Sequence, residues 1–352
     1  MNSSDPVKRH RARKIIGIFL AFIALGFLIA SGLKNPEQTA SLFLESNKIL
    51  ILVILGFQVV SFGINAFISR QLLKFTGNKT TFSNNMQIAV ANEFGNWVMP
   101  IAGGSITSYF VYKRIGIPTS VILFLETAGI LLNSFQYVVF FFLSVLILPF
   151  SVISLIPRIG LYVIAAAIVV IVGGWYFFSG KERLDQLKKL VFRIIRIVKK
   201  ISPFKLNEQI LSEKIEHGSA TITDNFSYFF SKPKSTAFIF LCSSMYFATD
   251  IFMLNLSFQA FGFHTSLALT TFGLILSLLL SVLTLFPGSP GVTETSLILV
   301  FKTFGVPYHV ALLSVFLFRL LSYWMWLPLS IYITFAGKKS ATQSRIENIP
   351  IQ

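Results

Sequence analysis

Five ionisable side chains stand within long apolar stretches of the sequence, where charge is costly. They are four acids and one arginine, namely Glu93, Glu126, Asp250, Glu294 and Arg319. At the centre of a bilayer such a group costs on the order of 3 kcal/mol unless it is paired or hydrated, so each is a candidate functional residue. Carboxylates can accept hydrogen bonds, bind a cation or act as a base, and an arginine can pair with an acid or hold a phosphate.

The sequence lacks the combinations of residues that catalysis or metal binding would need. The single cysteine, Cys242, excludes a disulfide or a thiolate metal cluster within one chain. The histidines are scattered at His10, His217, His264 and His309, and no HExxH, Walker or nucleophile-elbow motif is present. We therefore expect no metal, no cofactor and no enzymatic activity.

Two segments rich in glycine and proline interrupt the apolar runs in a similar way. They are "MPIAGGSITSYFVYKRIGIPTSVILFLE" (99–126) and "FPGSPGVTETSLILVFKTFGVPYHVALLSVFLFR" (286–319). In each, a proline and small residues precede a short apolar helix, a basic residue, "GIP" or "GVP", and a long helix with one charge, Glu126 or Arg319. The likeness predicts an internal pseudo-repeat, which in membrane transporters points to the binding site.

A helix that begins inside a bilayer directs unpaired N–H groups and the positive end of its dipole into a cavity. Gly103, Gly104 and Ser105 suit one such start, and the "GSPG" stretch from Gly288 to Gly291 suits the other. Irregular backbone at that depth is tolerated only where it is buried in protein or lines a cavity. Two such ends facing one cavity would suit an anion such as a phosphate head group. The alternative is that both clusters merely kink ordinary membrane spans.

The elements that position these residues are membrane helices. The chain of 352 residues is 54% hydrophobic and 12% charged, with a mean hydropathy of +0.73. A crossing helix needs roughly 20 mostly apolar residues. A signal peptide at the first apolar run is the weaker interpretation, since the run is long for one. The candidate spans are about 15–33, 49–68, 119–148, 159–178, 235–259, 266–286 and 308–335.

Loop charges predict the orientation of these spans, because cytoplasmic loops collect Lys and Arg. The N-terminus, the loop 69–85, the stretch 180–234 and the C-terminal tail are basic and are expected in the cytoplasm. All four basic segments can lie on the cytoplasmic side only if 86–112 enters the membrane from the cytoplasm and returns to it, and if 266–304 starts and ends outside. The predicted fold is therefore all-α: a polytopic membrane bundle of about seven spans plus two re-entrant half-helix segments in an inverted pseudo-repeat.

The net charge of +16 is explained by this topology, so no nucleic-acid partner is expected. The chain is read as a single integral membrane domain, 1–352, with a first half, 1–179, and a second half, 235–352. Between them, 180–234 is a cytoplasmic linker in which 181–201 has the pattern of a basic amphipathic helix. Such a helix lies on the anionic inner leaflet of the membrane.

The stretches "NEFGNWVMPIAGGSITSYFVYKRIGIP" and "LFPGSPGVTETSLILVFKTFGVP", with "FRLLSYW" beyond, resemble the two signature regions of the lysylphosphatidylglycerol synthase transmembrane (flippase-like) family. The resemblance covers nearly the whole chain, and its more specific part is Pro287 to Glu294 with Arg319. It implies a protein of the inner cell membrane that moves a modified phospholipid or a lipid-linked sugar between leaflets. The aminoacyltransferase domain of longer relatives has no counterpart here, so lipid synthesis is not expected.

The predicted substrate site has two walls. The first comprises Asn92, Glu93, Pro100, Gly103, Gly104, Ser105 and Glu126; the second comprises Pro287, Gly288, Gly291, Glu294 and Arg319. Two roles stay open: Glu294 caps its half-helix or touches the cargo, and Arg319 binds the cargo or forms a structural pair with Glu294 or Asp250. The alternative function is a membrane enzyme, with Glu93 or Glu294 as base, or an accessory subunit acting on a lipid carrier with a glycosyltransferase or lipid synthase partner.

Overall fold

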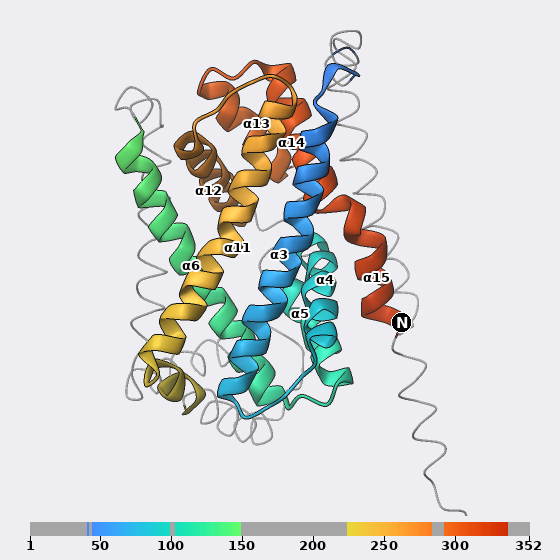
Figure 1. Ribbon diagram of the computed structural model, residues 1–352, viewed down its shortest axis with the longest axis vertical. Helices are drawn as coiled ribbons and strands as arrows, with labels where there is room; N and C mark the ends of the chain where they lie inside the picture. Colours follow the sequence, from blue (N-terminus) through green and yellow to red (C-terminus); the bar gives the residue numbers. More distant parts are fainter. Residues whose placement is uncertain (1–40, 42–43, 99–102, 149–223, 284–291, 337–352) are drawn as a thin grey trace, which may run out of the picture.

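A computed structural model describes residues 41, 44–98, 103–148, 224–283 and 292–336 of the chain (Figure 1). Every element in these ranges is a helix, which confirms the predicted all-α class. Several predictions fall outside the described residues: the spans 15–33 and 159–178, the amphipathic helix 181–201, both chain termini, and Pro100, Pro287, Gly288 and Gly291.

Four helical runs in the described ranges are long and apolar enough to cross a membrane. They are α3 (Lys48–Phe75), α6 (Thr119–Ile147), α11 (Pro233–Ala260) and the run Tyr308–Phe335, and they coincide with four of the predicted spans. At about 1.5 Å per residue the three uninterrupted helices α3, α6 and α11 are each roughly 42 Å long, which exceeds a hydrocarbon core of about 30 Å.

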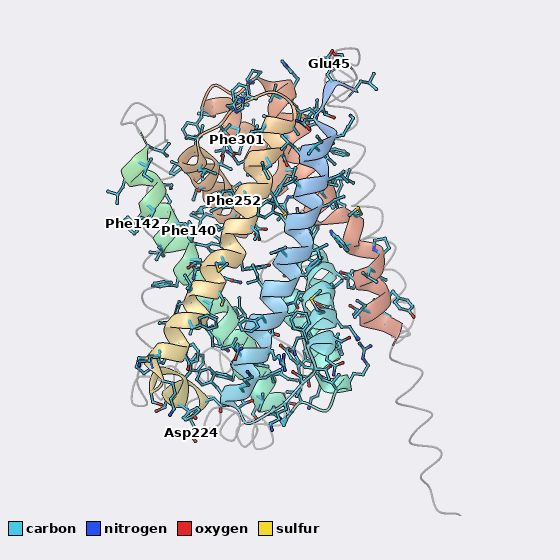
Figure 2. The ribbon with its side chains drawn as sticks, in the orientation of Figure 1. Glu45, Phe140, Phe142, Asp224, Phe252 and Phe301 are labelled. Carbon is cyan, nitrogen blue, oxygen red and sulfur yellow. The ribbon has the colours of Figure 1, made fainter. Side chains whose placement is uncertain are left out.

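The outer faces of the long helices are apolar. On α6, Leu146 is 80% exposed and Ile147 72% exposed, and on α3 Leu52 is 68% exposed. Figure 2 places Phe142 at the outer edge of α6, away from the other helices. Exposing this much apolar surface to water is unfavourable, so these faces suit the hydrocarbon of a bilayer.

Two pairs of short helices separate the long ones. The first pair is α4 (Phe82–Val98) and α5 (Gly103–Arg114); the second is α12 (Leu267–Leu283) and α13 (Val292–Thr303). In Figure 1, α4 and α5 lie in the lower half of the molecule and α12 and α13 in the upper half. The predicted span 266–286 thus corresponds to α12, whose 17 residues are about 25 Å long, short of the hydrocarbon thickness.

Glycines allow the two helices within each pair to approach closely. A Cβ added to Gly104 of α5 would lie 2.4 Å from the Asn96 side-chain oxygen of α4. A Cβ added to Gly273 of α12 would lie 2.8 Å from the Phe301 ring of α13. Each short pair is therefore a packed hairpin in which a glycine lets the facing side chain keep its position.

The described helices fall into two sets of matching lengths. We call α3 to α6 the first set, and α11, α12, α13 and α14 (Tyr308–Ser322) the second set. The helices α3 and α11 have 28 residues each, α4 and α12 have 17, and α5 and α13 have 12. The same order of long, medium and short helices therefore occurs twice in the chain.

The register of the two sets also agrees. The helices α11 and α12 start 185 residues after α3 and α4, and α13 and α14 start 189 residues after α5 and α6. Positions at these offsets are called equivalent below. Left-handed glycines occupy equivalent turns, with φ of 73° at Gly77 and 72° at Gly262, and 85° at both Gly116 and Gly305.

The sets differ at the end of their last helix. Helix α6 is continuous over 29 residues, whereas α14 ends at Ser322 and is followed by the short helix η1 (Trp324–Trp326) and by α15 (Leu327–Ala336). Helix α15 packs against the first hairpin, where the Ser330 hydroxyl donates to the Val90 carbonyl.

The long helices α3 and α11 run antiparallel through the middle of the bundle (Figure 1). The Asn47 N–H at the start of α3 donates to the Ala260 carbonyl at the end of α11, at 2.9 Å. One apolar core surrounds the α12–α13 hairpin, and a second joins the α4–α5 hairpin to the beginning of α6. Polar side chains therefore gather between the two cores.

Candidate functional site

A cavity of about 390 Å³ lies between the two helix sets. Its volume is within the range of small-ligand pockets, about 300–1,000 Å³. All five ionisable residues that the apolar stretches contain line this cavity: Glu93, Glu126, Asp250, Glu294 and Arg319. The helices thus bring together charges that are up to 226 residues apart in the chain.

One end of the cavity holds an arginine–glutamate ion pair. The Arg319 Nε atom lies 3.3 Å from Glu294 Oε1, and Glu294 is only 3% exposed. The Arg319 guanidinium also lies 5.8 Å from the Phe318 ring and 5.9 Å from the Tyr323 ring. The sequence left open whether Arg319 pairs with Glu294 or with Asp250, and in the structure its ion-pair partner is Glu294.

Glu294 has a second favourable partner in its own helix. It stands in the first turn of α13, where the positive end of the helix dipole stabilises a carboxylate. A guanidinium carries five N–H donors and one carboxylate engages two at most, so Arg319 retains donors for another acceptor at the cavity wall. Pairing with Glu294 and binding an anion are therefore compatible roles for Arg319.

A second polar group of residues, the Glu126 cluster, lies in the first set. It comprises Ser69, Ser105, Ser108, Tyr112 and Glu126. The Ser108 hydroxyl of α5 donates to Glu126 Oε1 of α6, and Ser105 also hydrogen-bonds to this carboxylate. The Tyr112 hydroxyl is hydrogen-bonded to Ser69 of α3. The cluster ties α3, α5 and α6 together through polar contacts at the cavity wall.

Two further acids face the middle of the cavity. Glu93 of α4 interacts electrostatically with Asp250 of α11, and both interact with Arg319. Beside them, the Tyr246 hydroxyl is hydrogen-bonded to Asn65 of α3. These electrostatic contacts link α4, α11 and α14 at the cavity.

Asn92 adds an unfilled hydrogen-bonding site. Its side-chain oxygen is buried and accepts no hydrogen bond from the described residues. Asn92 is also among the residues that line the cavity, next to Glu93 in the chain. Buried polar atoms normally have a partner, so a ligand group or a water molecule is expected there.

The structure brings together most of the described residues of the predicted site. Of the predicted site residues, those that line the cavity are Asn92, Glu93, Gly104, Ser105, Glu126, Glu294 and Arg319. Gly103 begins helix α5 next to Gly104, and the remaining four predicted residues lie outside the described ranges.

The sequence interpretation missed the polar face of α3. Gln58, Ser61, Asn65 and Ser69 all line the cavity and follow one another at spacings of three and four residues. Such spacing places side chains on one face of a helix. This periodicity could have identified the face, but the apolar residues between them made the segment look like a plain span.

Equivalent positions of the two sets meet at the cavity. Nine pairs of equivalent residues line it, among them Asn65 with Asp250, Ser105 with Glu294, and Ile130 with Arg319. The two sets thus supply the same backbone positions to the wall but different side chains. The ion pair Glu294–Arg319 has a serine and an isoleucine as its counterparts in the first set.

Within the described part of the chain, no three His, Cys, Asp or Glu residues are arranged to hold a metal ion. Among the described residues that line the cavity, one is basic, Arg319, and four are acidic. This arrangement can bind a phosphate-type anion at one end and hydrogen-bond donors or cations along the acidic wall.

Comparison with known proteins places this architecture in a membrane family. The model of a family described as "Lysylphosphatidylglycerol synthase TM region" matches residues 14–330. A "UPF0104 membrane protein" of Archaeoglobus fulgidus is 21% identical over 310 residues, covering 88% of this chain and 92% of that protein. A protein of the same description from Methanothermobacter thermautotrophicus is 24% identical over 331 residues, covering 90% of this chain and 91% of that protein.

Proposed function

This chain belongs to the lysylphosphatidylglycerol synthase TM region family, and from that premise we propose that it is a lipid flippase of the inner cell membrane. Its cargo is a modified phospholipid or a lipid-linked sugar, which it moves between leaflets. The observation that carries the proposal is the cavity enclosed by apolar-faced helices and lined by the Glu294–Arg319 pair. A polar chamber inside such a bundle suits a head group that must cross hydrocarbon.

In this proposal the α4–α5 and α12–α13 hairpins are re-entrant segments that enter from opposite faces of the membrane. The two helix sets then form an inverted repeat, with both chain termini in the cytoplasm. Support comes from the equal helix lengths, from the short hairpin helices and from the opposite halves that the hairpins occupy in Figure 1. Inverted repeats with broken helices bind their substrates near the midplane, where the cavity lies in this proposal.

The head group is proposed to lie between Arg319 and the beginning of α5. Helix α5 starts with Gly103, Gly104 and Ser105 and has no acid in its first turn. Helix α13 has Glu294 at the position equivalent to Ser105, so its dipole is already satisfied by a carboxylate. The N-terminus of α5 therefore keeps N–H groups and positive potential for a phosphate that Arg319 contacts from the other side.

Lipid transport is favoured over the alternative of an enzyme or accessory subunit by the position of the acids. Of the two candidate bases, Glu294 is held by Arg319, and Glu93 lines a cavity whose described lining residues include no histidine and no cysteine. A base without a nucleophile or an activated water is a weak basis for catalysis. A glycosyltransferase or lipid synthase partner that supplies the cargo is compatible with transport, as is contact with anionic lipid.

The proposal is tested by leaflet exchange of fluorescent lipids in vesicles that contain the purified protein. Anionic, zwitterionic, aminoacyl and polyprenyl-sugar lipids are compared, with Arg319→Ala as the site variant and Arg70→Ala, an exposed arginine of α3, as the matched control. We expect wild type and Arg70→Ala to accelerate exchange of at least one lipid. In Arg319→Ala the rate of lipid exchange should fall about tenfold, as expected for the loss of one charge-assisted hydrogen bond. No acceleration of any of these lipids, or equal rates for both variants, would overturn the proposal.

A further inference from the structure

A compact apolar group in the second set, which we call the Phe301 plug, lies one helical turn beyond the cavity-lining residues Asp250, Thr293 and Phe318. It consists of Leu254, Phe258, Leu297, Phe301 and Val315, and each of these side chains is 0% exposed. The Phe301 ring lies 4.6 Å from the Phe258 ring and against Gly273, which has no side chain to hold it away. Figure 2 shows Phe301 in the upper part of the bundle, near α11 and α13.

The equivalent positions in the first set have the opposite character. They are Ser69, Leu73, Ser108, Tyr112 and Glu126, so four of the five are polar and belong to the Glu126 cluster. Ser69, Tyr112 and Glu126 line the cavity, whereas none of the plug residues does. The same framework is therefore built with polar side chains on one side of the cavity and with apolar ones on the other.

The extent of the cavity along the helices agrees with this difference. On α3 it reaches from Gln58 to Leu72, which is from near the middle of the helix almost to its end. That stretch is about 21 Å long. On α11 the lining residues run only from Ser243 to Asp250, near the middle of that helix. The cavity thus extends from the centre of the bundle toward the α4–α5 side and ends before the plug.

We propose that the Phe301 plug is the closed gate of the cavity and that the Glu126 cluster is its entrance. The inference rests on the proposed function, since a gate matters only if a head group passes. A polar head group enters between α3, α5 and α6, where hydroxyl and carboxylate groups replace its hydration. It is stopped at the plug because a dry apolar constriction excludes polar and charged groups. Passage requires that α13 separate from α11 and α14 at Phe301.

The experiment measures from which face a cysteine at the inner side of the plug is reached. Cys242→Ala removes the native thiol, and Thr293→Cys places a new one at the cavity wall, one turn before Leu297. Vesicles with the protein in known orientation are treated on either face with a membrane-impermeant thiol reagent. We expect the thiol to be modified from the α4–α5 face at least about tenfold faster than from the α12–α13 face, as for a hydrophobic gate.

Phe301→Ala in this background should open the second face and raise modification from it by about tenfold. The matched control is Phe124→Ala, which removes the same ring from an equally buried position in the first set and should leave access one-sided. If Phe301→Ala does not fold, judged by gel filtration, Leu297→Ala replaces it. Equal rates from the two faces in the Thr293→Cys parent would overturn the gate, as would continued blockage in the plug variant.

The two proposals fail in different ways. One-sided access together with no lipid exchange would overturn transport and leave the apolar closure at the Phe301 plug in place. Two-sided access in the Thr293→Cys parent together with normal lipid exchange would overturn the gate alone.

Discussion

Arg319 is held in the cavity by a partner from another helix and by two rings. The Nε contact to Glu294 at 3.3 Å and the adjacent Phe318 and Tyr323 rings fix the guanidinium. A buried charge of this kind depends on its partner, because removing one member leaves the other without compensation. The pair therefore makes the site rigid as well as charged.

Glu294→Gln should lower the unfolding temperature of the protein in detergent by an amount corresponding to about 3 kcal/mol, the usual cost of breaking a buried pair. The double variant Glu294→Gln with Arg319→Met should recover most of this loss, because it removes the orphaned charge as well. Glu45→Gln, which changes an exposed acid, serves as the control. A double variant no more stable than Glu294→Gln alone would show that the pair is not the source of the loss.

At the scale of the elements, the repeated order of helices rests on turns that only certain residues allow. Gly116 and Gly305 both have φ of 85° and both connect a 12-residue helix to a long one. Pro118 and Pro307 follow as the N-cap residues of α6 and α14. The sequence motifs "GIP" and "GVP", which the sequence interpretation placed between a short and a long helix, coincide with these two turns, because the requirement for a left-handed residue is local.

Gly116→Ala and Gly305→Ala should each destabilise the protein by about 1–2 kcal/mol, since a side chain in the left-handed region is strained. The effects should be similar for the two variants because the turns are equivalent. Thermal unfolding in detergent measures them, with Gly56→Ala as a control, since Gly56 lies within α3 and a Cβ added to it would meet open space. Unchanged unfolding temperatures for both turn variants would contradict the importance of these turns.

At the scale of the whole molecule, two apolar cores enclose a polar middle. One core surrounds the α12–α13 hairpin and the other joins the α4–α5 hairpin to α6. Since α3 and α11 run antiparallel, the turn after α3 and the turn after α11 lie at opposite ends of the bundle (Figure 1). In a membrane these two ends would face opposite compartments.

Single cysteines at two exposed positions test this arrangement. In the Cys242→Ala background, Lys113→Cys lies at the end of α5 and His264→Cys in the turn between α11 and α12. We expect an impermeant thiol reagent to modify Cys variants at 113 only from the cytoplasmic side and those at 264 only from the opposite side. Labelling of both from the same side would contradict the re-entrant topology.

The sequence by itself determined the helical class, the four long spans that the structure describes, the hairpin breaks and the charged candidates. These depend on apolar runs, on glycine and proline, and on the cost of charge in lipid, all of which act over short stretches of chain. Only the tertiary structure decided that Arg319 pairs with Glu294, that the polar face of α3 joins the cavity, and that Tyr112 lines it whereas the equivalent Phe301 does not. These arrangements depend on how separate helices pack against one another, and no local pattern encodes that packing.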